Sequence, residues 1–291
     1  MIPNSKKNPK VCIVTPCYNM GLLLQETVQS IKNQTFNDFE MIVVDDGSTD
    51  VETINILKEI EIPNGFVVCI DNSGLPAARN HAIKKTRAKY ILPLDSDDKL
   101  HPEYLEKTIQ ILENDLNEEL AFVTTDYRFF EEKDIRGIPK DFNPIALAVE
   151  NCIPVTSLFR RKCWVEVGGY NEALKGYQDW NLWISFVARG YRWQVIREEL
   201  FYYRDRKGSM LKGSDKIRGQ LAAEIYDDNE IFYKKHSEDV IKEYGERLGQ
   251  LWVKVRGLQS QLEAMKDMKK STDQNWWVVL GRKLGVMKTN A

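Results

Sequence analysis

The sequence lacks the marks of several large classes of protein. Its 41 basic and 43 acidic residues give a net charge of −2, so there is no surplus of positive charge for binding nucleic acid. No apolar run approaches the roughly 20 residues that a membrane-spanning helix needs. The three histidines, at positions 81, 101 and 236, are far apart in the chain, which argues against a histidine-rich zinc site.

Cysteine is also scarce. There are five cysteines, an odd number, with no Cys-x-x-Cys pair, and several lie in apolar runs. Reduced, buried thiols of this kind are typical of a cytosolic protein. We therefore expect a cytoplasmic location, with peripheral contact at the inner face of the membrane as an open alternative.

Two common phosphate-binding motifs are missing from the sequence as well. Neither a G-x-x-x-x-G-K-[ST] loop nor a G-x-G-x-x-G turn occurs in the chain. P-loop proteins and dinucleotide-binding proteins hold phosphates with these motifs. The sequence therefore gives no support to a P-loop or a dinucleotide-binding function.

Strand and helix patterns alternate from residue 10 to about residue 127. The apolar runs KVCIVT, EMIVVDD, GFVVCI, YILPL and LAFVTTDY are separated by the helical patterns GLLLQETVQSIKNQ, VETINILKEI, LPAARNHAIKKTR and PEYLEKTIQILEND. Such alternation predicts βαβ units on a mostly parallel sheet. Because the strands are nearly continuous apolar runs, the sheet should be covered on both faces. The predicted fold class is therefore α/β, with helices flanking the sheet.

The pattern changes in the second half of the chain. Residues 128–156 are polar and irregular, and we interpret them as a mobile loop or lid. A strand, a Gly-Gly turn and a helix follow, and the pattern is helical from about Asp215 onward. This change predicts a first domain over residues 1–214 and a C-terminal helical region over residues 215–291.

The segment NWWVVLGRKLGVMK pairs aromatic side chains with Arg282, Lys283 and Lys288. It is compatible with an amphipathic helix on a membrane surface. We favour a simpler interpretation, a helix that packs on its own domain or on a partner. Peripheral membrane contact and a homodimer through the C-terminal helices both stay open.

Polar side chains follow three of the predicted strands where each strand ends. The stretches are TPCYN (Thr15–Asn19), DDGSTD (Asp45–Asp50) and DSDD (Asp95–Asp98). Ligands of open α/β sheets bind outside the carboxyl ends of the strands. These side chains could therefore build one site.

The three acids of DSDD repel one another, which raises the pKa of each unless a cation or solvent relieves the repulsion. A Mg²⁺ or Mn²⁺ ion between Asp95, Asp97 and a nucleotide diphosphate, with Asp98 beside them, would provide that relief. A solvated turn with helix-capping acids is the alternative, and the residues alone leave both open. An EF-hand is excluded because Lys99 and Leu100 occupy its fifth and sixth positions.

Further candidate side chains lie beside the same edge of the sheet. Asp45 and Asp46 end a strand, where a carboxylate can accept hydrogen bonds from a base or a ribose hydroxyl. Asp50 is expected to cap the next helix. Arg79 lies near a helix start, which suits contact with a phosphate or a nucleobase. An exposed helix arginine is the alternative for Arg79.

Asp179 is the candidate general base. It lies at the start of the predicted helix QDWNLWISFVARG, in which Trp180, Trp183 and Val187 share one face. A carboxylate there could accept the proton of an acceptor hydroxyl, although a helix N-terminus lowers the pKa of a carboxyl group. The other interpretation is a helix N-cap, and the residues alone do not decide between the two.

Taken together, the motifs resemble those of family 2 glycosyltransferases with the GT-A fold. The resemblance rests on TPCYN, DDGSTD, GLPAARN, DSDD and GGYNEALKGYQDWNLWISFVARGY, in this order, over residues 10–210. It implies a Rossmann-like mixed sheet with a C-terminal helical extension, and an inverting sugar transfer with Mn²⁺ or Mg²⁺. It places Asp179 as the catalytic base and Asp95, Asp97 and Asp98 at the metal. The implied nucleotide-binding residues are Pro16, Tyr18, Asn19, Asp45, Asp46, Arg79, Asp95 and Ser96.

One position departs from the family pattern. Relatives often carry Y-R-x-H-x-x-S after the last strand, whereas this chain has YYRDRKGSM, with Arg206 in place of the histidine. Arginine cannot ligate a metal, but it can neutralise a diphosphate. Either the enzyme uses fewer protein ligands for its metal, or Arg204 and Arg206 hold the leaving diphosphate directly.

The resemblance implies transfer of a sugar from a UDP-sugar to a glycan or lipid-linked hydroxyl, in the synthesis of a bacterial-type cell-surface polysaccharide. Two alternatives stay open: a GT-A module that binds a nucleotide sugar or glycan without turnover, and a nucleotidyltransferase. The intact Asp97 and Asp179 argue against the binding module, and Arg206 argues for it.

Overall fold

The computed structural model describes residues 8–206 and 213–283, with only the backbone described at Asp215 and over residues 267–283. The chain divides into two compact units, Met1–Ser237 and Glu238–Ala291.

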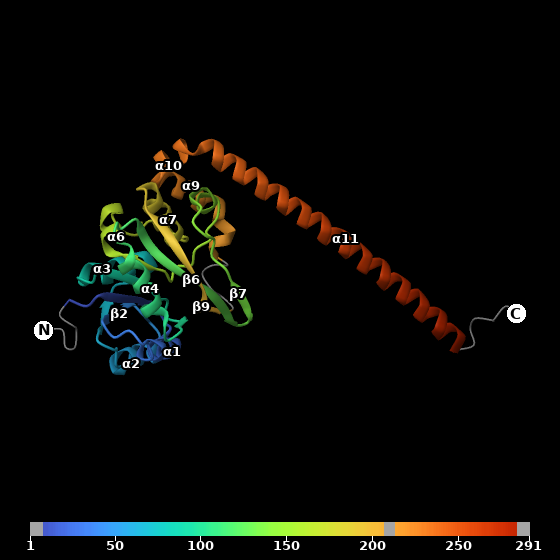
Figure 1. The fold of residues 1–291 in the computed structure, drawn as a ribbon. Helices are drawn as coiled ribbons and strands as arrows, with labels where there is room; N and C mark the ends of the chain where they lie inside the picture. Colours follow the sequence, from blue (N-terminus) through green and yellow to red (C-terminus); the bar gives the residue numbers. More distant parts are fainter. Residues whose placement is uncertain (1–7, 207–212, 284–291) are drawn as a thin grey trace. The chain divides into compact units, whose positions relative to one another are not determined.

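The first part of the sheet is parallel, as the alternating pattern predicts (Figure 1). Strand β1 lies between β2 and β4, and β3 pairs with the outer side of β2. Every residue of β1 and β2 is buried, which confirms a sheet covered on both faces. The elements are β1 (Val11–Cys17), α1 (Gly21–Lys32), β2 (Phe39–Asp46), α2 (Val51–Glu59), β3 (Phe66–Ile70), α3 (Leu75–Lys85) and β4 (Tyr90–Pro93).

The second part makes the sheet mixed. Strand β8 pairs antiparallel with both β4 and β6, and the long strands β6 and β9 pair in parallel. The order across the sheet is β3-β2-β1-β4-β8-β6-β9-β5. The Rossmann-like mixed sheet flanked by helices is therefore confirmed. The elements of this part are β5 (Lys99–Leu100), α4 (Tyr104–Asn114), β6 (Leu120–Glu131), β8 (Leu158–Arg160), α6 (Arg161–Val167), α7 (Gln178–Ala188) and β9 (Arg192–Asp205).

Residues 128–156 are more regular than the expected loop or lid. Strand β6 continues to Glu131 and pairs with β7 (Ile135–Gly137), and α5 (Pro144–Val149) follows. The side chain of Trp180 in α7 donates a hydrogen bond to the α5 carbonyl of Leu147 at 2.6 Å. The prediction of an irregular stretch is wrong here because elements of three and six residues are too short to produce a visible period.

The predicted apolar face of α7 is confirmed. Trp180, Trp183 and Val187 are all buried. The rings of Trp183 and of Phe122 in β6 lie with centroids 4.5 Å apart. This packing fixes α7 against the sheet, and it thereby sets the position of the residues at the start of the helix.

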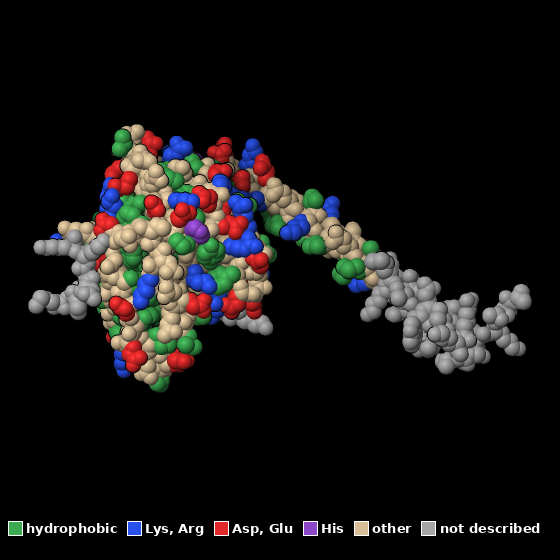
Figure 2. Space-filling view, turned by 60° about the horizontal axis from the view of Figure 1, so that its bottom comes forward, with side chains coloured by type: hydrophobic (Ala, Val, Ile, Leu, Met, Phe, Trp, Pro, Cys, Tyr) green, Lys and Arg blue, Asp and Glu red, His purple; other side chains and the backbone are tan. Residues whose placement is uncertain are grey.

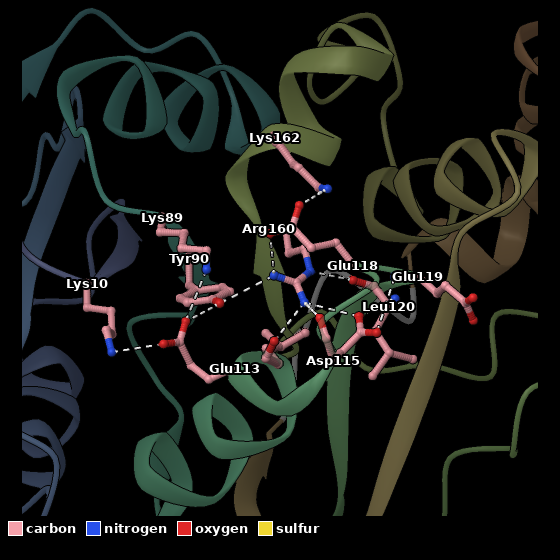
Figure 3. A network of polar contacts seen from close by, with 11 residues as sticks. Lys10, Lys89, Tyr90, Glu113, Asp115, Glu118, Glu119, Leu120, Arg160 and Lys162 are labelled. Carbon is pink, nitrogen blue, oxygen red and sulfur yellow. Dashed lines mark hydrogen bonds and ion pairs between the residues drawn. The ribbon is translucent and has the colours of Figure 1, made fainter.

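A buried arginine joins β8 to the segment between α4 and β6 (Figure 3). The Arg160 guanidinium donates to the carbonyls of Leu112 and Leu120 at 2.7 and 2.8 Å, and forms an ion pair with Asp115 at 3.1 Å. Tyr90 of β4 accepts a further hydrogen bond from it at 3.3 Å. Arg160 of β8 therefore links this strand to its two neighbours in the sheet, β4 and β6.

The chain is helical after β9, as predicted, within the residues described there. The short helix η1 (Asp215–Ile217) leads to α9 (Arg218–Asp228) and α10 (Glu230–Lys235). Asn229, between α9 and α10, donates to Asn181 of α7 at 2.8 Å, and the Tyr233 hydroxyl donates to the carbonyl of Ala148 at 2.9 Å. The first compact unit thus includes α9 and α10, which were predicted from the sequence to belong to the C-terminal region. The domain division at residue 214 stays a prediction.

The described part of the second unit belongs to one helix of 47 residues, α11 (Ser237–Lys283), whose first residue ends the first unit. Among the described residues, no helix combines the length and apolar character needed to cross a membrane. The side chains of the predicted amphipathic segment at residues 275–288 lie outside the described residues.

Candidate active site

Two cavities adjoin at the carboxyl edge of the parallel strands. The first, which we call the strand-end cavity, has a volume of about 410 Å³. It is lined by Pro16, Cys17, Tyr18, Met20, Asp46, Asn72, Gly74, Leu75, Asp95, Ser96, Asp97, Asp98, Tyr203, Arg204 and Arg206. The predicted convergence of three strand ends on one site is therefore confirmed as geometry.

The second cavity, the α7 cavity, has a volume of about 380 Å³. Asp179, at the start of α7, lines it together with Arg79 of α3 and Asn151, which follows α5. Asp95, Leu75 and Tyr203 line both cavities. Two small ligands held in the two cavities would thus meet at Asp95 and Tyr203.

The nucleotide-binding residues predicted from the motifs fall into two groups. Pro16, Tyr18, Asp46, Asp95 and Ser96 line the strand-end cavity itself. The others support it or lie next to it, as the following contacts show.

Asn19 ties two strand-end loops together. Its side-chain oxygen accepts hydrogen bonds from the backbone N–H groups of Thr49 and Asp50 at 2.8 and 2.9 Å. Asp45 accepts from the backbone N–H of Ser48 at 2.9 Å, within the same turn. Asp50 caps α2 by accepting from the N–H of Thr53 at 2.8 Å, as predicted.

Asp46 fixes the loop that leads into α3. Its two carboxylate oxygens accept from the backbone N–H groups of Ser73 and Gly74 at 2.7 and 2.9 Å. Gly74 has φ +89°, a left-handed conformation that glycine adopts at no steric cost. The strand-end carboxylate therefore shapes the wall of the cavity through this loop.

Arg79 is only 2% exposed, so the alternative of an exposed helix arginine is wrong. It forms an ion pair with Asp95 at 2.6 Å and lies over the ring of Tyr170. This pair stands between the two cavities, because Arg79 lines the α7 cavity and Asp95 lines both.

The acids of DSDD do not form a solvated turn with helix-capping side chains. Asp98 is 2% exposed, and the side chains of Asp95 and Asp97 are 28% and 17% exposed. The next long helix, α4, has Glu103 at its N-cap and no side-chain cap hydrogen bond, so that alternative is wrong. Burial raises the pKa of Asp97, and the nearby charge of Asp95 raises it further. Burial also raises the pKa of Asp98 well above its usual range, with added repulsion from Asp97 and Asp95.

Two arginines relieve part of this repulsion. Arg206 forms an ion pair with Asp97 at 2.8 Å. The backbone N–H of Arg204 donates to Asp98 at 2.8 Å, and its guanidinium donates to the carbonyl of Asp97 at 2.7 Å. Opposite charges beside a buried carboxylate stabilise its ionised form.

Arg204 is also engaged on its outer side. Its guanidinium forms ion pairs with Glu26 of α1 at 2.9 Å and with Glu131 of β6 at 2.6 Å. Arg204 thus links the DSDD loop to α1 and to β6. Neither Glu26 nor Glu131 was predicted from the sequence, since neither belongs to a motif. Direct contact of Arg204 with a diphosphate stays a prediction.

The donor chemistry of the DSDD loop fits a divalent cation held by two carboxylates. Asp95 and Asp97 both line the strand-end cavity, and Mg²⁺ or Mn²⁺ takes carboxylate oxygens readily. In the described part of the chain, no group of three or more His, Cys, Asp or Glu side chains is placed to hold a metal ion. Asp98 is turned toward the backbone of Arg204. The metal itself stays a prediction.

Asp179 lies in the first turn of α7, but Tyr177 is the N-cap residue, with φ 54°. The N-cap interpretation of Asp179 is therefore wrong. Its carboxylate accepts a hydrogen bond from Asn151 at 3.1 Å. Burial raises the pKa of Asp179, although the Asn151 hydrogen bond and the Arg79 charge oppose the shift. A raised pKa makes this carboxylate a stronger base than the helix position alone suggests.

Comparison with known proteins agrees with this geometry. An uncharacterized glycosyltransferase from Methanocaldococcus jannaschii is 32% identical to this chain over 210 residues. The match covers 67% of this chain and 71% of that protein. A putative teichuronic acid biosynthesis glycosyltransferase of Bacillus subtilis is 29% identical over 208 residues, covering 67% of this chain and 79% of its own.

A solved structure shares the fold. The structure of S. aureus TarS 1–349 in complex with UDP-GlcNAc superimposes with a TM-score of 0.59 at 21% identity, over 70% of this chain. The chain spans 60% of the length of that structure. The family model for glycosyl transferase family 2 matches residues 12–163. With its fold, its strand-end site and its relatives in agreement, the chain belongs to glycosyl transferase family 2.

Proposed function

We propose that this glycosyltransferase moves a sugar from a UDP-sugar in the strand-end cavity to a hydroxyl group of an acceptor in the α7 cavity, with inversion at the anomeric carbon. The observation that carries the proposal is the shared wall of the two cavities. Asp95 and Tyr203 line both, so a donor and an acceptor would meet there.

Several features support a nucleotide in the strand-end cavity. Its volume of about 410 Å³ is in the range of small-molecule sites. The ring of Tyr18, at the lining, is 45% exposed and could stack on a base. TarS, which shares the fold, binds UDP-GlcNAc and UDP.

The diphosphate needs positive charge beside it. Arg206 lines the cavity and is partly exposed, so it could pair with a phosphate in addition to Asp97. A Mg²⁺ or Mn²⁺ ion would be held by Asp95 and Asp97, and it would supply charge that stabilises the leaving diphosphate.

The reaction itself is a single displacement. Asp179 accepts the proton of the acceptor hydroxyl while the acceptor oxygen forms a bond to the anomeric carbon. The bond from that carbon to the diphosphate oxygen breaks, and UDP leaves with the electron pair. Because attack comes from the face opposite the leaving group, the configuration inverts.

The acceptor is proposed to be a glycan or lipid-linked hydroxyl in polysaccharide synthesis on the cytoplasmic side. The name of the Bacillus subtilis relative refers to teichuronic acid biosynthesis, which supports this class of acceptor. The five cysteines all lie in the described residues and form no disulfide, which supports a reducing compartment.

Calorimetric titration of UDP, GDP and dTDP, each with Mn²⁺ and with EDTA, tests the donor side. We expect UDP alone to bind tightly, with a loss of affinity in EDTA and in Asp97→Ala. If UDP binds equally well in EDTA but not to Arg206→Ala, the arginine holds the diphosphate, and the predicted metal ion is wrong. If none of the three binds, the proposed donor site is wrong.

Turnover separates the proposal from its alternatives. With UDP-sugar and an acceptor, the enzyme should release UDP in proportion to the sugar transferred. A binding module would bind UDP without turnover. A nucleotidyltransferase would instead release pyrophosphate from UTP.

A further inference from the structure

Helix α11 carries an apolar stripe that follows a seven-residue repeat. From Ile241 to Met265, eight apolar positions are separated by alternating steps of three and four residues, and Trp252 and Val253 are exposed apolar residues outside that series. In the usual notation the first members of each heptad, the a positions, are Ile241, Leu248, Val255 and Leu262. The d positions are Tyr244, Leu251, Leu258 and Met265.

No other described element of the second unit covers these side chains. Within the described residues, the eight are between 42 and 70% exposed. Hydrophobic side chains recur along the described part of α11 in Figure 2. An apolar stripe that a single helix leaves in solvent is a surface for another helix or for a membrane.

The shape of the stripe favours another helix. It is narrow and keeps a strict period of 3.5 residues over three and a half heptads, which is the pattern of a left-handed coiled coil. A membrane-surface helix has a wide apolar face and a polar face rich in Lys and Arg. Here the opposite face carries acids, among them Glu246 and Glu263, as well as Arg256.

We infer that α11 pairs with α11 of a second copy of this chain, as a parallel, in-register, two-stranded coiled coil from Ile241 to Met265. Pairing with an identical helix sets each a residue against its own copy and each d residue against its own copy. Leu251 and Leu258 at d, with β-branched Ile241 and Val255 at two of the four a positions, are typical of two-stranded coils, and Leu248 and Leu262 occupy the other two a positions. Each a or d side chain of the stripe therefore packs against the same apolar side chain of the second copy.

The flanking charges favour the parallel orientation. In a parallel pair, each g residue faces the e residue of the next heptad on the partner. That rule pairs Arg247 with Trp252 of the partner subunit and Lys254 with Gln259 of the partner subunit. Neither pair joins like charges. An antiparallel pair would set g positions against g positions, and Arg247 and Lys254 are both basic.

Glycines in the same region lower the stability of α11 as an isolated helix, which favours a partner. Gly245, Gly249 and Gly257 lie inside the helix, and a Cβ at any of them would meet open space. Each glycine weakens an isolated helix relative to alanine, and none has a packing reason within the chain. None occupies an a or d position, so the seam is uninterrupted while the lone helix is weak.

The mass of the full chain in solution tests the pairing. Sedimentation equilibrium should give twice the chain mass of 33.8 kDa. The double variant Leu251→Asp with Leu258→Asp should raise the dissociation constant by on the order of 100-fold or more, since it sets charges in an apolar seam. Val253→Asp, an equally apolar and 74% exposed position on the outer face, should remain dimeric.

Cross-linking tests the orientation. Leu258→Cys should form a disulfide with its own copy under mild oxidation, because only a parallel, in-register pair brings two d positions together. Ser260→Cys, on the outer face, is the matched control, and the unchanged chain reports any background from the exposed Cys69.

Several results would overturn the inference. These are a wild-type chain that is monomeric, a double variant with the wild-type mass, or a dimer in which Leu258→Cys and Ser260→Cys cross-link equally. Monomers that bind anionic vesicles through α11 would assign the stripe to a membrane instead. UDP binding should be the same in all these variants, so the outcome is independent of the proposed function.

Discussion

At the scale of single residues, the site depends on which charges the fold brings together. Asp95 and Asp97 each have an arginine partner, Arg79 and Arg206, at 2.6 and 2.8 Å. Asp179, in contrast, has the neutral Asn151 as its hydrogen-bond partner. A carboxylate whose pKa is raised and that lacks a directly bound cation is the one suited to accept a proton.

Asp179→Asn should therefore slow transfer strongly while leaving UDP binding unchanged. General-base catalysis contributes about 10²–10⁴-fold, so kcat should fall by a factor in that range, with the UDP dissociation constant within twofold of wild type. Because burial raises the pKa of Asp179 and the base acts when ionised, wild-type kcat should fall as the pH drops through a value above the usual 3.8.

A matched control is Asn151→Ala, which keeps the carboxylate but removes its hydrogen bond. It should retain transfer and move the acidic limb of the pH profile upward, since that hydrogen bond lowers the pKa of Asp179. An Asp179→Asn enzyme with wild-type kcat would rule out Asp179 as the base.

At the scale of elements, Arg160 decides how β8 is attached to its neighbours. It is 1% exposed and satisfies carbonyls at the end of α4 and the start of β6 as well as Asp115. Removing one partner of a buried, hydrogen-bonded pair leaves the others desolvated and unpaired, which is more costly than losing an exposed pair.

Arg160→Met should lower the free energy of unfolding by about 3–5 kcal/mol, the range for a broken buried ion pair. Lys162→Met serves as the control, because Lys162 pairs with Glu118 of the same segment while its side chain is 41% exposed. That change should cost less than about 1 kcal/mol. Denaturant unfolding measures both, and equal effects would contradict the role given to Arg160.

At the scale of the whole molecule, the helices α9 and α10 belong with the first compact unit. The contacts of Asn229 with Asn181 and of Tyr233 with Ala148 join them to α7 and α5. The first turn of α7 and the segment directly after α5 line the α7 cavity. Acidic and basic side chains are interspersed on the face shown in Figure 2, in keeping with the small net charge.

A chain ending at residue 237 should therefore be more stable than one ending at residue 214. We expect the shorter chain to unfold at a temperature lower by about 5 °C or more, since a loss of 1 kcal/mol shifts the midpoint of a domain this size by about 2–4 °C. Equal midpoints would favour the domain division at residue 214 instead.

The sequence by itself determined the alternation of the longer strands and helices up to about residue 127, the convergence of TPCYN, DDGSTD and DSDD on one edge, and the apolar face of α7. These features follow from local periods and from the rule that parallel strands end at one edge. The heptad stripe of α11 was equally present in the sequence, but its significance depends on its exposure, which only the structure shows.

Tertiary structure alone decided the partners of the acids, the order within residues 128–156 and the direction of the pKa shift of Asp179. Each depends on contacts between distant parts of the chain: Arg204 reaches Glu26 across 178 positions, and Asn151 reaches Asp179 across 28. A carboxylate near a helix start has a lowered pKa when solvent surrounds it. Here burial reverses that direction, and burial is set by the packing of α5, α7 and the sheet together.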